Sequence, residues 1–200
     1  MMERLLRLTL CLVLVALLAA ACGQKEPERQ TSFEKPPEME IDTNKTYEAK
    51  IETTKGDFTI ELFAEDAPVT VNNFVFLARH RYFEGIVFHR IVPEFVIQTG
   101  DPTGTGYGGP GYAFEDELNS PHKYEPGIVA MANSGPNTNG SQFFVCTGEA
   151  SITLNDKPDY TIFGKIKDGM DTVLAIGNTP VNGDVPLEHV KIEKVTITEK

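Results

Sequence analysis

Two short segments of this 200-residue chain combine hydrogen-bonding side chains with apolar neighbours in a pattern that could serve chemistry. The first is Phe88–Gln98, where Arg90 stands among Ile, Val and Phe residues. The second is Met131–Phe144, where Asn133 interrupts another apolar run. An unpaired buried guanidinium costs several kcal/mol. The arginine therefore indicates either an exposed strand face or a binding site that uses its charge.

Each of these residues has an ordinary structural explanation when it is considered alone. Phe95 and Phe144 could be core aromatics, and Arg90 could lie on the solvent side of a strand. The Gly, Asn and Pro residues between positions 135 and 140 would by themselves indicate only a turn. Their joint occurrence in one order and spacing is what favours a single functional site.

In that order and spacing, the two segments resemble the active-site strands of the cyclophilin-type peptidyl-prolyl isomerases. The resemblance extends from about Tyr47 to the end of the chain. It implies an enzyme that acts on proline-containing polypeptides without a metal or cofactor. It also implies a mainly β fold, a closed eight-stranded antiparallel barrel capped by two α-helices. The alternative function is a non-catalytic peptide-binding or holdase module of the cell envelope, which would keep the groove without turnover.

The resemblance also implies roles for individual residues. Arg90 would be the catalytic donor to the prolyl nitrogen of a twisted amide, Gln98 would hold its guanidinium, and His89 would lie beside it at the rim. Asn133 would grip the substrate through its main chain, and Gln142 would touch the residue on the other side. The remaining substrate-binding residues implied in this way are Phe95, Val96, Gly104, Met131, Ala132, Phe144, Leu154 and Tyr160.

One loop, Gly148–Asp159, departs from the family pattern. Cyclosporin-sensitive cyclophilins commonly carry Trp just before the leucine that matches Leu154, whereas this chain has Thr153 there and contains no Trp. Tyr160 stands where many members have His. We therefore expect an intact proline-isomerising site with weaker cyclosporin binding.

Two further motifs are interpreted as structural. Gly104–Gly109 satisfies the dinucleotide-binding pattern G-x-G-x-x-G, but Pro110 and Gly111 follow where that fold requires a helix. Asn139-Gly140-Ser141 matches a glycosylation sequon, yet it lies inside the resemblance to the active-site strands.

The composition suits one globular domain with an extension. Charged residues make up 24% of the chain and apolar residues 40%. The net charge of −11 disfavours binding to nucleic acid, whose phosphates would be repelled. We expect a monomer, and we expect Cys146, between Val145 and Thr147, to be a small buried strand residue.

Residues 1–21 are predicted to be a lipoprotein signal peptide. Arg4 and Arg7 precede the apolar run Leu8–Ala21, which is too short for a membrane-spanning helix and ends at Cys22. Cys22 would then be lipidated and become the first residue of the mature chain. A plain secretory signal cleaved near Ala21 is the alternative. The protein is thus expected outside the cytoplasm, lipid-anchored on the periplasmic or outer-surface side of a membrane.

The rest of the chain divides into a tether, residues 22–46, and an isomerase domain, residues 47–200. The tether is rich in Glu, Lys, Gln and Pro, and a flexible chain of its length would hold the domain about 25–30 Å from the membrane. In the domain, the sequence predicts four elements and, between the two helices among them, a series of short strands from Val87 to Gly164. Those elements are a hairpin from Ala49 to Leu62, a helix from Asp66 to about His80, a helix from about Gly169 to Ile176, and a closing strand near Val190–Ile197.

Overall fold

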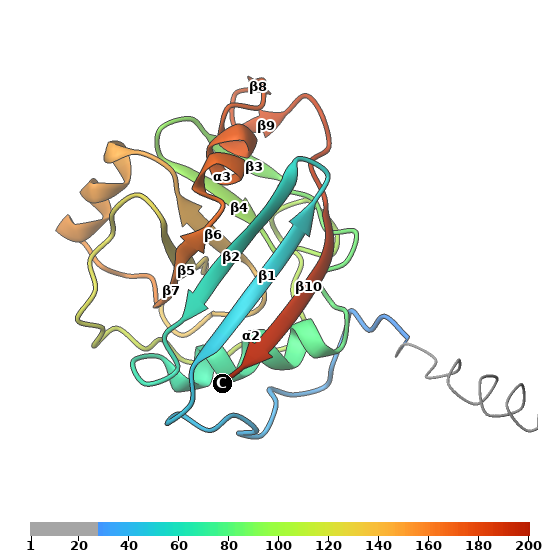
Figure 1. Ribbon diagram of the computed structural model, residues 1–200, viewed down its shortest axis with the longest axis vertical. Helices are drawn as coiled ribbons and strands as arrows, with labels where there is room; N and C mark the ends of the chain where they lie inside the picture. The colour runs from blue at the N-terminus through green and yellow to red at the C-terminus, as the bar shows by residue number, and fades with distance from the viewer. Residues whose placement is uncertain (1–27) are drawn as a thin grey trace, which may run out of the picture.

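A curled antiparallel sheet forms the body of the protein in the computed structural model, which describes residues 28–200 (Figure 1). The predicted signal peptide and Cys22 lie outside the described residues. The eight strands follow the spatial order β10-β1-β2-β7-β5-β6-β4-β3. Their bounds are β1 (Tyr47–Thr53), β2 (Gly56–Leu62), β3 (Arg90–Val92), β4 (Val96–Thr99), β5 (Ile128–Met131), β6 (Phe143–Cys146), β7 (Ile162–Asp168) and β10 (Ile192–Glu199).

The sheet is open, which corrects the expectation of a closed barrel. In the part of the chain that the structure describes, no strand ladder joins the two edges, β3 and β10. A single bridge between Val87 and Lys191 spans the gap, supported by a hydrogen bond from the Phe88 N–H to the Val190 carbonyl at 2.9 Å. The β3 edge does not extend far enough to pair with β10, because the segment before β3 consists largely of turns instead of a strand.

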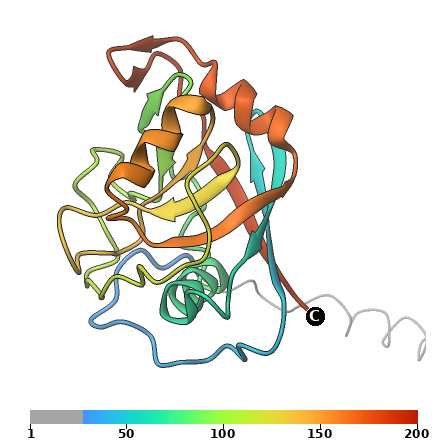
Figure 2. The ribbon, with the colours of Figure 1, turned by 90° about the vertical axis from the view of Figure 1, so that its left-hand side faces the viewer.

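Both predicted helices form, and they lie at opposite ends of the curled sheet (Figures 1 and 2). They are α2 (Pro68–Arg79) and α3 (Met170–Gly177). Pro68 suits the first turn of α2 because it has no N–H to leave unpaired. The free N–H groups of that turn are bound by the distant Glu117, whose carboxylate accepts from Val69 and Thr70. The interior of the sheet is filled by an aromatic cluster around Phe74.

Two further elements are absent from the sequence-based prediction. One is a 3-10 helix, η1 (Glu149–Asp156), in the loop where the chain departs from the family pattern. The other is a separate two-stranded hairpin made of β8 (Val181–Asn182) and β9 (Val185–Pro186). Residues 100–127, where short strands were expected, contain no helix or strand beyond one isolated bridge at Phe114. Within residues 28–200, no helix has the length and apolar character needed to cross a membrane.

Residues 28–46, here called the N-terminal strap, lie against the domain, although their composition predicts a free tether. Asn72 of α2 is buried, and its side chain binds the strap from two directions. Its amide oxygen accepts from the main-chain N–H groups of Glu40 and Ile41 at 2.8 and 3.3 Å. Its amide nitrogen donates to the Glu38 carbonyl at 2.9 Å. These bonds are made to the backbone, so few apolar residues are needed to hold the strap.

Phe33 makes the aromatic contacts of the strap, which also buries Ile41 in the core. Its ring is half-buried and meets Phe76 at 4.9 Å, His80 at 5.5 Å and Tyr82 at 6.5 Å between ring centroids. Its N–H donates to the Pro110 carbonyl at 2.8 Å. The Phe33 ring therefore joins the strap to helix α2 and to the turn after it, and the Phe33 N–H joins it to the glycine-rich segment.

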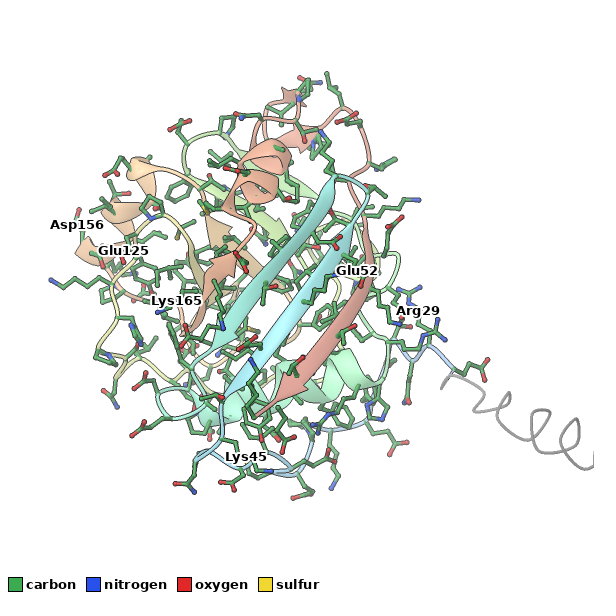
Figure 3. All side chains as sticks on the ribbon, in the orientation of Figure 1. Arg29, Lys45, Glu52, Glu125, Asp156 and Lys165 are labelled. Atoms are coloured by element: carbon green, nitrogen blue, oxygen red, sulfur yellow. The ribbon has the colours of Figure 1, made fainter. Side chains whose placement is uncertain are left out.

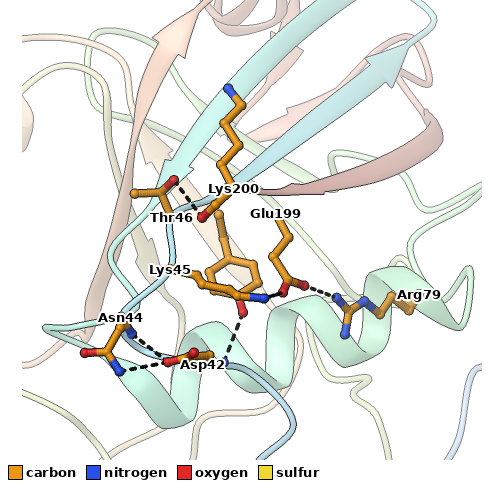
Figure 4. A network of polar contacts seen from close by, with 8 residues as sticks. Asp42, Asn44, Lys45, Thr46, Arg79, Glu199 and Lys200 are labelled. Carbon is orange, nitrogen blue, oxygen red and sulfur yellow. Dashed lines mark hydrogen bonds and ion pairs between the residues drawn. The ribbon is translucent and has the colours of Figure 1, made fainter.

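Polar contacts hold the C-terminal end of the strap against β10 and α2 (Figure 4). Glu199 forms ion pairs with Lys45 at 2.6 Å and with Arg79 at 3.1 Å. The Asp42 N–H donates to the Tyr47 hydroxyl at 3.0 Å. The three ion-paired side chains are partly exposed, so each ion pair adds little stability by itself. Together they fix where the strap passes into β1.

The beginning of the strap lies far from η1. In Figure 3, Arg29 lies at one edge of the molecule and Asp156 of η1 at the other. The first backbone contact of the strap is made by the Gln30 N–H, which donates to the His80 carbonyl at 3.2 Å. The chain thus enters the fold on the side opposite η1.

Phe33→Ala is expected to lower the free energy of unfolding by about 2 kcal/mol, less than for a fully buried Phe, because a half-buried ring loses its contacts. The shift of the urea midpoint measures this change. Met39→Ala is the matched control, since Met39 lies in the same strap with 53% of its surface exposed. Equal midpoints for the two variants would show that Phe33 does not hold the strap.

Candidate active site

The β3–β4 hairpin places Arg90 directly opposite Gln98. Their strands pair Arg90 with Gln98 and Ile91 with Ile97. Because successive strand side chains alternate between faces, the two isoleucines point into the core, where both are fully buried. Arg90 and Gln98 consequently share the outer face of the sheet. The predicted contact between these two residues follows from this register.

The same face continues across β6 and β5. Gln98 pairs with Phe144, and Phe144 pairs with Ala130, so the polar pair and the aromatic ring lie in one row. This row belongs to a second hydrophobic cluster that is separate from the interior core and that includes Val96 and Cys146. Cys146 is fully buried there, as expected, and burial raises the pKa of its thiol to about 11. The candidate site is therefore on the wall of the sheet and not in its interior.

A cavity of about 170 Å³ opens over this row. A dry cavity of about 150 Å³ lined by apolar side chains accepts benzene, so a pyrrolidine ring is a reasonable occupant here. The Phe144 and Tyr160 rings meet edge to face at 5.5 Å on one side of the cavity. We call this cavity the proline pocket; its lining residues are Arg90, Phe95, Val96, Gln98, Ala132, Asn133, Phe144, Leu154 and Tyr160.

A chain of hydrogen bonds runs from Arg90 away from the proline pocket. The Arg90 Nη1 donates to Gln98 Oε1 at 3.4 Å, and Gln98 Nε2 donates to Gln142 Oε1 at 3.0 Å. Gln142 Nε2 in turn donates to the carbonyls of Gly106 and Gly108, each at 2.9 Å. Gln142 lies in a neighbouring cavity of about 240 Å³, which Gln98, Ala132 and Asn133 also line. The two cavities are thus parts of one groove.

Asn133 lies between the two cavities with its side chain already engaged. Its Nδ2 donates to the Asp159 carbonyl at 2.9 Å, and its Oδ1 accepts from the Gly135 N–H at 3.2 Å. The backbone grip predicted for this residue would accordingly use its main-chain groups, which the side-chain bonds hold in place.

Three predicted site residues lie outside both cavities of the groove. Met131 is buried in the interior core, because the strand alternation that turns Ala130 outward turns Met131 inward. Gly104 lies beside Val87 in a different surface depression. His89 packs near Gly106, and neither of its ring nitrogens has a hydrogen-bond partner among the described residues. Burial lowers the pKa of His89 and outweighs the opposing effect of Asp101, so its imidazole is neutral at pH 7.

Sequence reasoning missed Asp101, which organises the glycine-rich segment. Its carboxylate accepts from the N–H groups of Thr103 at 2.7 Å, Thr105 at 2.9 Å and Gly106 at 2.6 Å. Burial alone would raise its pKa, but the hydrogen bonds outweigh it and lower the pKa to about 2. A side chain at Gly108 would collide with this carboxylate. An Asp just before a glycine-rich run is a signal for such a turn.

Of the glycines that match the dinucleotide pattern, Gly106 donates its N–H to this internal carboxylate and Gly104 donates to the Asp101 main-chain carbonyl. The asparagine of the sequon likewise has a structural role. Asn139 is fully buried, and its Nδ2 donates to Glu115 O and Asp116 Oδ1. In residues 28–200, no group of three or more His, Cys, Asp or Glu side chains is placed to hold a metal ion.

Comparison with known proteins assigns the chain to a family. The sequence profile of the family described as "Cyclophilin type peptidyl-prolyl cis-trans isomerase/CLD" matches residues 48–197. The chain is 47% identical to the peptidyl-prolyl cis-trans isomerase-like 1 of Aspergillus oryzae, over 74% of this chain and 94% of that protein. The chain is a cyclophilin-type peptidyl-prolyl cis-trans isomerase. It is also 46% identical to the isomerase-like 3 protein of Rattus norvegicus, over 74% of this chain and 93% of the other.

Solved cyclophilins agree with the fold. A crystal structure of a Cryptosporidium parvum cyclophilin-type isomerase superposes with a TM-score of 0.72 at 38% identity, over 76% of this chain and 98% of that one. A second structure of the same protein, in the presence of the dipeptide Ala-Pro, gives a TM-score of 0.71. The mainly β cyclophilin architecture expected from the sequence is thereby confirmed, with an open sheet in place of a closed barrel.

Thr153→Trp is expected to tighten cyclosporin binding to this cyclophilin about tenfold, because an indole adds stacking area and an N–H donor worth about 1.4 kcal/mol. Thr153 is exposed in η1, next to Leu154 of the proline pocket, and its hydroxyl donates to the Ala150 carbonyl. Isothermal titration calorimetry measures the change, and Thr153→Ala controls for loss of the hydroxyl. If the unchanged protein binds as tightly as the Trp variant, the match of this loop to the family is wrong.

Proposed function

We propose that this cyclophilin uses Arg90 to accelerate X–Pro bond rotation in exported proteins while a lipid on Cys22 holds it at a membrane. The observation that carries the catalytic part is the placement of Arg90 at the wall of the proline pocket, opposite Gln98. Binding alone would not require a strong donor beside a site for the prolyl ring. The arrangement therefore favours turnover over a holdase function.

Rotation about an amide faces a barrier of about 18–20 kcal/mol, because conjugation makes the C–N bond partly double. Twisting the bond breaks that conjugation and returns a lone pair to the prolyl nitrogen. A guanidinium N–H that donates to this lone pair stabilises the twisted state more than the planar one. Lowering the barrier by about 5.5 kcal/mol raises the rate about 10⁴-fold.

The remaining residues would position the substrate. Phe95, Phe144 and Leu154 would enclose the prolyl ring, and Asn133 would bind the flanking backbone. Gln98 and Gln142 would orient Arg90 from the groove side. The substrate class is supported by the Cryptosporidium parvum relative, whose crystal structure is described in the presence of the dipeptide Ala-Pro. Rotation about the C–N bond transfers no proton, so this scheme assigns no acid or base role to His89, whose imidazole is neutral.

Exchange NMR on an X–Pro peptide tests the catalytic proposal. The purified protein is expected to broaden the cis and trans resonances through accelerated exchange at substoichiometric concentration. Shifts of the peptide resonances without accelerated exchange would instead identify a binding module. Size-exclusion chromatography of the same sample tests the expected monomer.

The membrane proposal depends on the N-terminal sequence. The apolar run Leu8–Ala21, followed at once by Cys22, favours lipidation and export. Mass spectrometry of the mature N-terminus tests it: a chain that begins at lipid-modified Cys22 is expected. An unmodified terminus at Cys22 or beyond would identify a secreted protein.

A further inference from the structure

The β8–β9 hairpin stands apart from the eight-stranded sheet, and no step proposed so far uses it. Its strands pair Val181 with Pro186 and Asn182 with Val185, so Gly183 and Asp184 form a two-residue turn. Gly183 has a φ of +67°, which a two-residue hairpin turn of this kind requires. In Figure 1 the hairpin lies near the top of the molecule, in the region of β3.

The tip of this hairpin is joined to β3 through Asp184 alone, by two separate bonds. The main-chain carbonyl of Asp184 accepts from the Ile91 N–H at 2.8 Å. Its side-chain Oδ2 accepts from Arg90 Nε at 2.9 Å. The backbone bond fixes the position of the Asp184 main chain, so the carboxylate is held near Arg90. The hairpin thus places a carboxylate beside Arg90, the arginine that lines the proline pocket.

Arg90 is consequently held at two points on its planar group. Asp184 binds Nε, and Gln98 binds Nη1 from the neighbouring strand. Two contacts on different nitrogens fix the plane of a guanidinium, whereas one contact leaves it free to turn. Since the guanidinium carries five N–H groups, others stay available to a substrate.

We propose that Asp184 is a positioning residue for the isomerase reaction, holding the Arg90 guanidinium so that its free N–H groups point into the proline pocket. This inference depends on the role proposed above for Arg90. The competing explanation is an ordinary surface ion pair, since the side chains of Arg90 and Asp184 are 39% and 53% exposed. Such pairs contribute little to stability, so activity and not unfolding must decide between the explanations.

Asp184→Ala in the purified full-length protein is expected to lower kcat about tenfold and leave KM nearly unchanged, because the substrate still finds its pocket but meets a mobile donor. Asp184→Asn is expected to recover most of the loss, since its amide oxygen can still accept from Nε. The matched control is Glu188→Ala, which removes a carboxylate from the same segment, where it pairs with Lys55. Wild-type kcat in Asp184→Ala, or a loss equal to that of the control, would overturn the proposal.

A double-mutant cycle separates positioning from a general structural effect. If Asp184 acts only through Arg90, adding Asp184→Ala to Arg90→Ala costs no further activity. An equal tenfold loss in both backgrounds would overturn the proposal. The ¹⁵Nε–¹Hε signal of Arg90 should also shift and broaden in Asp184→Ala while backbone amide signals of β3 persist. If Arg90→Ala itself retains full activity, the proposed role of Arg90 fails, and that result is distinguishable from failure of Asp184 alone.

Discussion

Replacing Arg90 by alanine is expected to lower kcat/KM for an X–Pro peptide by about 10²–10³-fold, the range found when one preorganised donor to a transition state is removed. The variant should remain folded, because Arg90 lies on the outer face of β3 and is half-exposed, while Ile91 and Ile97 carry the core packing. Exchange NMR at high enzyme concentration measures the residual turnover.

Two further variants test the reason for that loss. Arg90→Lys keeps the charge but not the planar fork that reaches Gln98 and Asp184, so an intermediate activity is expected. Arg79→Ala is the matched control, since it removes an arginine that pairs with Glu199 at the far end of β10. Near-wild-type turnover in a folded Arg90→Ala protein would rule out the proposed mechanism.

Replacing Cys22 by serine is expected to abolish membrane attachment through a lipid. A single acyl chain binds a bilayer only marginally, whereas a lipoprotein cysteine carries at least a diacylglycerol, which is enough for stable anchoring. The variant should appear in the soluble fraction or as an uncleaved precursor, and its isomerase activity should be unchanged. Cell fractionation followed by mass spectrometry of the N-terminus measures both outcomes.

Cys11→Ser is the matched control for that experiment, because Cys11 lies within the apolar run and would be removed with the signal peptide. It should leave the membrane fraction unchanged. If Cys22→Ser stays in the membrane fraction as a processed chain, another part of the protein provides the attachment.

Local periodicity was sufficient to predict the β1–β2 hairpin, both helices and β10, since each element carries its own apolar pattern. Nine of the predicted site residues meet in the proline pocket, and strand register aligns four of them, namely Arg90, Val96, Gln98 and Phe144. Asp184 could not be found in this way, as its contact with Arg90 joins residues 94 positions apart. Its hairpin has only two residues per strand, too few for an alternating pattern.

The strap shows a different limit of sequence reasoning. Its composition indicates disorder because it offers few apolar residues to bury. The structure holds it largely through backbone hydrogen bonds to Asn72, which composition does not report. The long segment 100–127 is similar: its order depends on internal bonds such as those of Asp101, and not on helix or strand.

Docking of the strap sets how far a lipid-anchored enzyme could reach. A free chain from Cys22 to Thr46 would extend up to about 80 Å, whereas only eight peptide steps separate Cys22 from Gln30, or about 28 Å when fully extended. The domain would then lie close to the bilayer, and the side that carries Arg29 would face the membrane. The 3-10 helix beside the proline pocket, at the opposite edge, would face outward. Such an enzyme would act on polypeptides that reach it from the aqueous phase and not from the membrane.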